Sequence, residues 1–431
     1  MGEKKVDEYG GMGVGGGMGM GGFSLRNLRT FNSLKNPIYR LYYAGILGQR
    51  ASMNMQMIAR SLLVYRISGS AAILGVMSLF HAIPMLFLSL IGGVIADRVQ
   101  KKYVLIAGLV SSAVVSLGIA LALTLGYLSP ERTGSWWILA AAALLQGIIM
   151  GLMIPSRQAI IPEIVGEEEL MNAVSLDTLG MNTLRLLAPA AAGFLIDAFD
   201  FEAVYYTMTG MYLMGMAFIS FMPLTGTMTI RGGGALADII EGVKYLRRET
   251  TIILILVFTL FTVLLARPYF ILMPIFADDI LKVGATGMGV LISVSGIGAI
   301  TGSLTLASLP NKKRGLMLLA SSLIMGAALV GFSFSSSWPL SLGLIVFVGL
   351  GMAGRMTLGN TLLQYYVDDE YRGRVMSIYN MEFGLTSLGG FAAGLLAEAT
   401  GVQWTVGGFA MVLIFLSILG FAFLPRLRRL D

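Results

Sequence analysis

Residues 71–128 read AAILGVMSLFHAIPMLFLSLIGGVIADRVQKKYVLIAGLVSSAVVSLGIALALTLGYL. Two apolar runs, at residues 71–95 and 104–128, flank the short charged segment DRVQKK. An α-helix rises about 1.5 Å per residue and the hydrocarbon core of a bilayer is about 30 Å thick, so each run is long enough to cross a membrane. The stretch therefore predicts two membrane-spanning helices joined by a basic turn.

The same alternation of apolar runs and charged turns extends over the whole chain of 431 residues. Hydrophobic residues make up 56% of the chain and charged residues only 13%, which is too few to cover a water-facing surface. A lipid bilayer is therefore the expected surrounding of most of the protein. Twelve spans are expected, at residues 40–66, 71–95, 104–128, 136–156, 172–196, 203–223, 252–276, 287–308, 315–333, 338–360, 375–397 and 403–424.

Basic residues occupy alternate loops, which is the positive-inside pattern of membrane proteins and not a nucleic-acid-binding stripe. They precede the first span, fill the second loop and the central connection, and close the chain, whereas the other side has only Arg66, Arg132 and Lys282. This distribution predicts a multi-pass protein of the cell inner membrane with both termini in the cytoplasm.

The expected organisation has two similar halves. Gly193 aligns with Gly394 and Asp197 with Glu398, at equivalent places in spans five and eleven. The fold class predicted is an all-α membrane protein of twelve transmembrane helices in two pseudo-symmetric six-helix bundles. Its segments are a Gly/Met-rich tail with a short cytoplasmic segment (1–36), the first bundle (37–224), a linker with an amphipathic helix at 235–249 (225–251), the second bundle (252–424) and a basic cytoplasmic tail (425–431).

The loop between spans two and three, GVIADRVQKK, resembles the signature G-x-x-x-D-R-x-G-R-R of the major facilitator superfamily, with Gln100 at the second glycine. The resemblance implies the fold of that superfamily and transport by alternating access. It also implies a cytoplasmic gate, in which the Asp97 carboxylate meets the positive N-terminal end of span eleven, near Val375, when the transporter opens outward. The gating residues expected are Gly93, Asp97, Arg98, Lys101 and Lys102.

Span five contains RLLAPAAAG at residues 185–193, which resembles the G-P-x-x-G-G element of exporters in this superfamily. Pro189 would create a kink point and Gly193 would allow close helix packing, although an ordinary alanine-rich packing face is the alternative. Together with segments around residues 65, 157 and 373, this element resembles the branch of the enterobactin exporter and the macrolide-efflux proteins, over residues 31–424.

Charged residues inside apolar spans are costly and usually face a cavity or a partner. Arg50 and Arg185 each lie about 12 residues, or ~18 Å, from the cytoplasmic ends of their spans, so both are expected near the midplane as substrate-binding residues. His81 is a third candidate for the cavity, with a packing histidine as the alternative. Arg355 and Glu382 are expected to pair.

Proton antiport requires a carboxylate that can exchange its proton, and the candidates are Asp177 and Glu382. Arg185 is eight positions from Asp177, too far along the helix for an ion pair, so Asp177 is expected to have no local partner. Arg355 would hold Glu382 ionised. Asp177 is therefore ranked first.

The chain has no cysteine and one histidine, which argues against an enzyme, a cofactor and a metal site. The leading hypothesis is a monomeric, proton-coupled efflux transporter, an antiporter of bulky hydrophobic or amphiphilic compounds such as drugs, macrolides or siderophores, and hence a candidate for multidrug resistance. Its expected partners are the small-molecule substrate, protons and the lipid bilayer, with no nucleic acid. A uniporter, an importer or flippase such as a lysophospholipid carrier, and a membrane enzyme or receptor are the alternatives.

Overall fold

The computed structural model describes residues 29–132, 134–224, 241, 244–247, 249–310, 312–428 and 430. In these residues all regular secondary structure is helical. Large apolar side chains such as Phe87, Phe194 and Trp404 are exposed, as expected for helices that face lipid. The first 28 residues of the expected tail and most of the amphipathic helix expected at 235–249 lie outside the described residues.

The first half of the chain forms one bundle. A short 3₁₀ helix leads into it, and its longest helix, α4, is interrupted by positive φ angles at Gly166 (69°) and Asp200 (67°). These two interruptions separate the three stretches where spans four, five and six are expected. The elements are η2 (Arg29–Lys35), α1 (Pro37–Ser68), α2 (Ala71–Arg98), α3 (Lys101–Thr124) and α4 (Trp136–Ser220).

The second half forms the other bundle, and its first membrane helix is broken. Pro268 has no N–H to donate to the carbonyl of Leu264, so the helix divides there into short pieces. The elements are α6 (Thr250–Ala266), α7 (Pro268–Ile271), α8 (Met273–Ile275), η3 (Phe276–Ile280), α9 (Gly284–Ser308), α10 (Arg314–Phe334), α11 (Trp338–Tyr366), α12 (Arg372–Thr400), α13 (Val402–Phe423) and α14 (Pro425–Arg428).

All the expected spans fall on these helices. Nine segments of the described residues are long and apolar enough to cross a membrane, and one of them, Glu168–Ser220, is 53 residues long and contains the break at Asp200. The charge-rich helices α1 and α12 are not among the nine. The all-helical membrane fold is therefore confirmed, and the count of twelve spans stays a prediction.

The helix starts follow local rules of capping. The side chain of Asn36 accepts hydrogen bonds from the backbone N–H groups of the first turn of α1, and Pro37 occupies the first helical position. Gly69, with φ of 64°, ends α1, and Ser70 caps α2 one residue later. The tight turn between α1 and α2 is thus encoded by adjacent residues.

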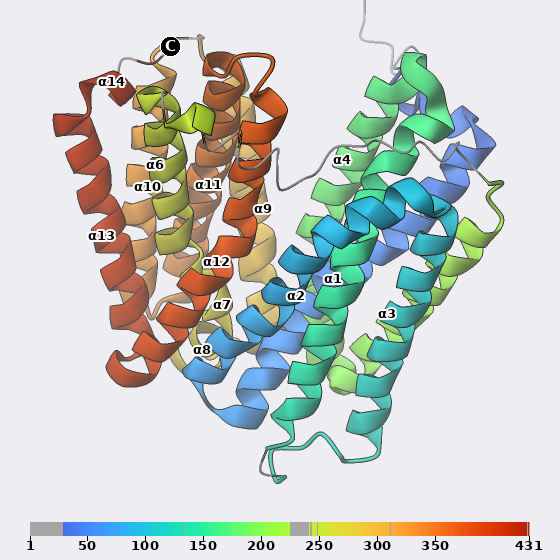
Figure 1. Cartoon of the computed structure of the whole chain (residues 1–431). Helices are drawn as coiled ribbons and strands as arrows, with labels where there is room; N and C mark the ends of the chain where they lie inside the picture. Colours follow the sequence, from blue (N-terminus) through green and yellow to red (C-terminus); the bar gives the residue numbers. More distant parts are fainter. Residues whose placement is uncertain are drawn as a thin grey trace, which may run out of the picture.

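Figure 1 shows the two bundles side by side, near one another at the lower end of the view and apart at the upper end, where α14 lies. We call these the closed end and the tail end. The main contacts between the bundles are those of α2 with α12 and of α4 with α9. Glycines permit both contacts: a β-carbon at Gly75 would lie 3.0 Å from the carbonyl oxygen of Phe391, and one at Gly289 would lie 2.5 Å from that of Pro189.

Candidate functional site

The first bundle contains a buried ion pair between Arg50 of α1 and Asp177 of α4. Arg50 donates to the Asp177 carboxylate at 2.6 Å and also to the backbone carbonyl of Asp177 at 2.5 Å. Asp177 has no partner on its own helix, as expected, but Arg50 from another helix of the bundle pairs with it. The role of Arg50 in substrate binding stays a prediction.

Tyrosines of α1 hold this pair in place. The hydroxyl of Tyr39 donates to the carbonyl of Ala173 at 2.7 Å, and that of Tyr43 donates to the carbonyl of Leu176 at 3.1 Å. Both carbonyls belong to the turn of α4 that precedes Asp177. The tyrosines therefore fix α1 against the segment that carries the carboxylate.

The second bundle contains the ion pair that was expected between Arg355 of α11 and Glu382 of α12. The two side chains lie 3.0 Å apart, and both are almost fully buried. Thr259 of α6 completes the site: its hydroxyl donates to Glu382 at 2.6 Å, and its carbonyl accepts from Arg355 at 3.2 Å. Sequence reasoning missed Thr259, because a threonine in an apolar span gives no distinguishing signal.

Each bundle thus contains one buried carboxylate paired with one arginine. Asp177 is the more accessible acid, with 17% of its side chain exposed against 7% for Glu382. One oxygen of Asp177 is buried without a hydrogen-bond partner among the described residues. Of the two carboxylates, Asp177 is the easier to reach.

Arg185 of α4 is exposed, and the next residue, Leu186, packs against Gly296 of α9 in the other half. Arg185 therefore lies on a part of α4 that borders the second half. Its role in substrate binding stays a prediction.

His81 is enclosed within the first bundle. A β-carbon at Gly147 of α4 would lie only 2.2 Å from the His81 carbonyl oxygen, so the two helices touch at this point. The Nδ1 of the imidazole is buried with no partner in the described part of the chain. This environment favours the packing histidine over a substrate-binding residue.

The loop with the expected gating residues lies at the tail end. Asp97 and Arg98 are exposed, and neither forms a hydrogen bond or an ion pair with any described residue. A β-carbon at Gly93 would meet nothing within 4 Å, whereas one at the neighbouring Gly92 would lie 2.5 Å from the carbonyl oxygen of Gly151. The expected contact of Asp97 with the start of α12 is thus not formed in this conformation, in which the bundles are apart at this end (Figure 1).

The two lysines of the loop are anchored within the first bundle. Lys101 pairs with Glu163 of α4 at 2.7 Å. Lys102 donates to the carbonyls of Ser220, at 2.8 Å, and of Met222. They tie the loop to α4 just before its first break and at its C-terminal end, and leave the Asp97 carboxylate free.

Pro189 and Gly193 lie where α4 packs on α9. A β-carbon at Gly193 would lie 2.2 Å from the carbonyl oxygen of Ala285, and Gly289 of α9 meets Pro189 in the same way. The small residues that follow Arg185 in the sequence therefore form part of the contact surface between the two halves.

Two acidic residues close the opposite end. Asp197 of α4 accepts hydrogen bonds from the backbone N–H groups of Ala285 (3.2 Å) and Thr286 (2.7 Å), in the first turn of α9. Glu398 of α12 accepts from the hydroxyl of Ser70 (3.0 Å) and from the N–H of Ala72 (3.1 Å), at the start of α2. Each half thus caps a helix of the other half.

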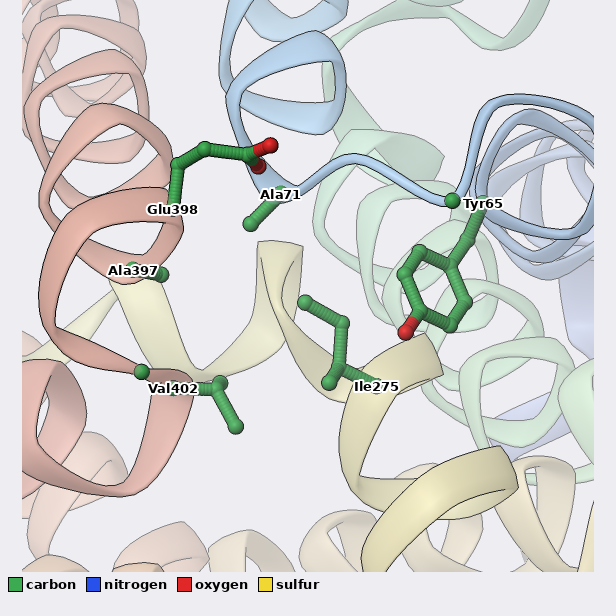
Figure 2. Close-up of a pocket in the computed structure, with 8 residues that line it drawn as sticks. Tyr65, Ala71, Ile275, Ala397, Glu398 and Val402 are labelled. Carbon is green, nitrogen blue, oxygen red and sulfur yellow. The ribbon is translucent and has the colours of Figure 1, made fainter.

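Further polar contacts support this closure. Arg66 of α1 binds Asp278 at 2.8 Å, and the hydroxyl of Tyr65 donates to Asp279. Beside them is a cavity of about 280 Å³. Figure 2 shows Tyr65 and Glu398 approaching it from α1 and α12, with Ile275 between them. Sequence reasoning missed these contacts, because charged residues in short loops usually face water.

The family model described as transmembrane secretion effector matches residues 28–431. The chain belongs to this family of major facilitator transporters. Among curated proteins, it is 24% identical over 338 residues to the staphyloferrin A transporter of Staphylococcus aureus, covering 78% of this chain and 83% of that one. It is 25% identical over 402 residues to the enterobactin exporter EntS of Shigella boydii, covering 89% of both chains.

Solved structures agree on the fold. A point mutant of the nucleoside transporter NupG superposes with a TM-score of 0.71 at 13% identity, covering 89% of this chain and all of the other. A point mutant of the peptide transporter POT, in complex with alafosfalin, also gives 0.71 at 14% identity, covering 91% and 95%. The resemblance to the major facilitator superfamily is therefore confirmed, and the protein is a multi-pass membrane transporter.

Proposed function

We propose that the protein is a proton-coupled exporter of a bulky amphiphilic compound, of the siderophore class, across the inner membrane. One observation carries the proposal. Each bundle contains a carboxylate–arginine pair that is mostly buried, while the polar caps between the halves found among the described residues lie at one end of the molecule. A single closed end and an acid inside a moving half that can exchange a proton support alternating access coupled to protons.

Orientation determines how this conformation is interpreted. With both termini in the cytoplasm, as the basic loops indicate, the closed end faces the periplasm and the tail end faces the cytoplasm. The conformation is then inward-facing, ready to receive a compound from inside the cell. The siderophore class comes from the two relatives named above, a staphyloferrin A transporter and an enterobactin exporter.

The coupling step rests on the two ion pairs. A proton delivered to Asp177 neutralises the carboxylate and releases Arg50, which then has no anionic partner at this position. The same argument applies to Glu382 and Arg355, with Thr259 as a further donor to the carboxylate. Asp177 is the first candidate, because a larger fraction of its side chain is exposed.

The test uses purified protein in proteoliposomes. Enterobactin and staphyloferrin A are added as substrates, with an imposed proton gradient, with an uncoupler, and with no gradient for downhill exchange. We expect gradient-driven movement that the uncoupler abolishes. The Asp177→Asn variant should lose the gradient-driven transport and keep the exchange, and Glu382→Gln is measured beside it. Full gradient-driven transport by both variants would exclude both carboxylates.

Import and uniport are separated by the same preparation. A uniporter moves the compound only down the gradient of the compound itself. The rate of that movement does not depend on the proton gradient and is not changed by the uncoupler. An importer accumulates it in the direction opposite to that of an exporter. Movement of dyes and macrolides under the same gradient tests whether the protein also contributes to multidrug resistance.

A further inference from the structure

Residues of both halves line the cavity of about 280 Å³ at the closed end. It lies between the turn that joins α1 to α2 and the turn that joins α12 to α13 (Figure 2). Ligand pockets usually have volumes of about 300–1,000 Å³, so this one suits a small molecule. Its lining residues include Tyr65 and Ala71 from the first half and Ile275, Ala397, Glu398 and Val402 from the second half.

Two glycines leave the mouth of the cavity open to water. Gly69 and Gly401 are exposed and have positive φ angles of 64° and 85°, and a β-carbon at either position would meet nothing within 4 Å. The floor is apolar by contrast, because Ala71, Ile275 and Val402 are only 6–9% exposed. A ligand would therefore enter from the aqueous side of the closed end and place an apolar part on the floor.

Glu398 gives the cavity a negative charge, and it is the one charged residue among the described residues that line it. Its carboxylate accepts hydrogen bonds from the hydroxyl of Ser70 and from the N–H of Ala72, and both go to the same oxygen, Oε2. The other oxygen, Oε1, has no hydrogen bond with a described residue. A carboxylate accepts several hydrogen bonds, so Oε1 is available to a donor.

The neighbouring charges favour a cation. Tyr65, on the wall of the cavity, donates its hydroxyl to the Asp279 carboxylate. Arg66, the next residue, is already bound to Asp278 by two hydrogen bonds of 2.8 and 3.1 Å. One carboxylate thus lines the cavity and a second borders it through Tyr65, and neither forms an ion pair within the described part of the chain. A positively charged ligand would be attracted to this place and an anion repelled.

We propose that the cavity binds a small organic amine. Its ammonium group donates to Oε1 of Glu398, and its apolar body lies on Ala71 and Val402. A primary ammonium has three donors and no acceptor, which matches an ionised carboxylate that only accepts. The inference goes beyond the proposed function and does not rest on it.

Binding of the amine should stabilise the closed end. Residues of both halves line the cavity, so it is complete only while the halves are in contact at this end. A ligand that binds one conformation better than the other shifts the equilibrium toward the first. The amine therefore acts as a bridge between the halves and favours the conformation described here.

The test is equilibrium binding of three probes of similar shape and different charge. Phenethylamine is a cation at neutral pH, 2-phenylethanol is neutral and phenylacetate is an anion. Isothermal titration calorimetry is carried out with the purified full chain in phosphatidylcholine nanodiscs, with empty nanodiscs as the blank. We expect phenethylamine to bind about tenfold more tightly than 2-phenylethanol, because its hydrogen bond is charge-assisted, and phenylacetate not to bind.

The ratio of the two affinities separates the charge of Glu398 from its role as a cap. Glu398→Gln should remove the preference for phenethylamine over 2-phenylethanol. Asp197→Asn removes the other cap and leaves the cavity residues unchanged, so it should weaken both probes by the same factor and keep the preference. A preference that survives in Glu398→Gln would overturn the proposal.

A second pair of variants tests the place of binding. Ala71→Leu fills the cavity and keeps the Glu398 carboxylate, so it should abolish binding of phenethylamine and 2-phenylethanol. Ala72→Leu makes the same change at the next residue, which does not line the cavity, and should bind both probes as the unaltered protein does. Thermal unfolding of both variants checks that they are folded. Unchanged phenethylamine binding in Ala71→Leu, or equal affinities of the unaltered protein for phenethylamine and 2-phenylethanol, would also overturn the proposal.

Discussion

Asp197 and Glu398 are equivalent residues at the ends of two repeated helices, and each carboxylate caps the first turn of a helix in the opposite half. Asp197 accepts from the start of α9, and Glu398 accepts from the start of α2. The N-terminus of a helix carries a partial positive charge, so an ionised carboxylate stabilises it. The closed end is therefore held by two related contacts, one for each pair of helices that joins the bundles.

Loss of either cap should open the closed end. Asp197→Asn and Glu398→Gln each remove a charge–dipole contact of about 0.3–2 kcal/mol, which shifts a balanced two-state equilibrium severalfold. The double variant should shift it further. The chain has no cysteine, so spin labels on Glu131→Cys and Ala399→Cys, both exposed near this end, report the separation of the halves by pulsed electron resonance.

Asp200→Asn is the control for the caps. Asp200 lies three residues from Asp197, is exposed, and has a positive φ of 67° that asparagine tolerates. Among the described residues, Asp200 caps no helix of the second half. The distance between the two spin labels in the Asp200→Asn variant should therefore match that in the unaltered protein. If Asp200→Asn opened this end as far as Asp197→Asn does, the effect would be one of general charge and not of capping.

A methyl group added at the contact between α4 and α9 should also open the closed end. A β-carbon at Gly193 would lie 2.2 Å from a backbone carbonyl of α9, a distance that side chains do not tolerate, so Gly193→Ala must move the helices apart. We expect the population to shift toward separation at the closed end, with reduced thermal stability. Gly210→Ala, where a β-carbon would meet nothing within 4 Å, should leave both the distance distribution and the melting temperature unchanged.

The long apolar runs were sufficient to predict the helices, because in lipid only a helix satisfies all backbone groups within one segment. The packing of Pro189 and Gly193 followed from the pattern of small residues in the same way. Partners across helices were harder to predict. Asp177 is paired with Arg50, 127 positions away in the chain, and a search along one helix could not find that residue.

The pairing of Arg355 with Glu382 was predicted because the two residues lie at similar depth on adjacent spans. The caps formed by Asp197 and Glu398 could not be predicted in the same way, because they depend on how the two bundles meet, and the sequence of one helix contains no information on that. The loop at Asp97 is a different case. Its contact is predicted for the outward-open conformation, so its absence from this one leaves the gate a prediction.

In the buried pair of the second bundle, loss of one charge should destabilise the protein much more than loss of both charges. Arg355→Leu leaves the Glu382 carboxylate buried without its cation, which costs about 3–5 kcal/mol in soluble proteins, whereas replacing both charges by apolar residues is often neutral. We therefore expect a much lower melting temperature for Arg355→Leu than for Arg355→Leu with Glu382→Leu. Equal melting temperatures for the two variants would show that the pair is not coupled.

The last prediction concerns the gate at the tail end. Asp97 is exposed and unpaired with any described residue in this conformation, so Asp97→Asn should leave its stability unchanged. The variant should lose stability only where Asp97 caps the start of α12, in the outward-open form. We expect the population to shift severalfold toward the conformation described here, with slower transport. Glu168→Gln, an exposed acid at the same end, serves as the control and should transport normally. Normal transport by a well-expressed Asp97→Asn variant would rule out the gating role.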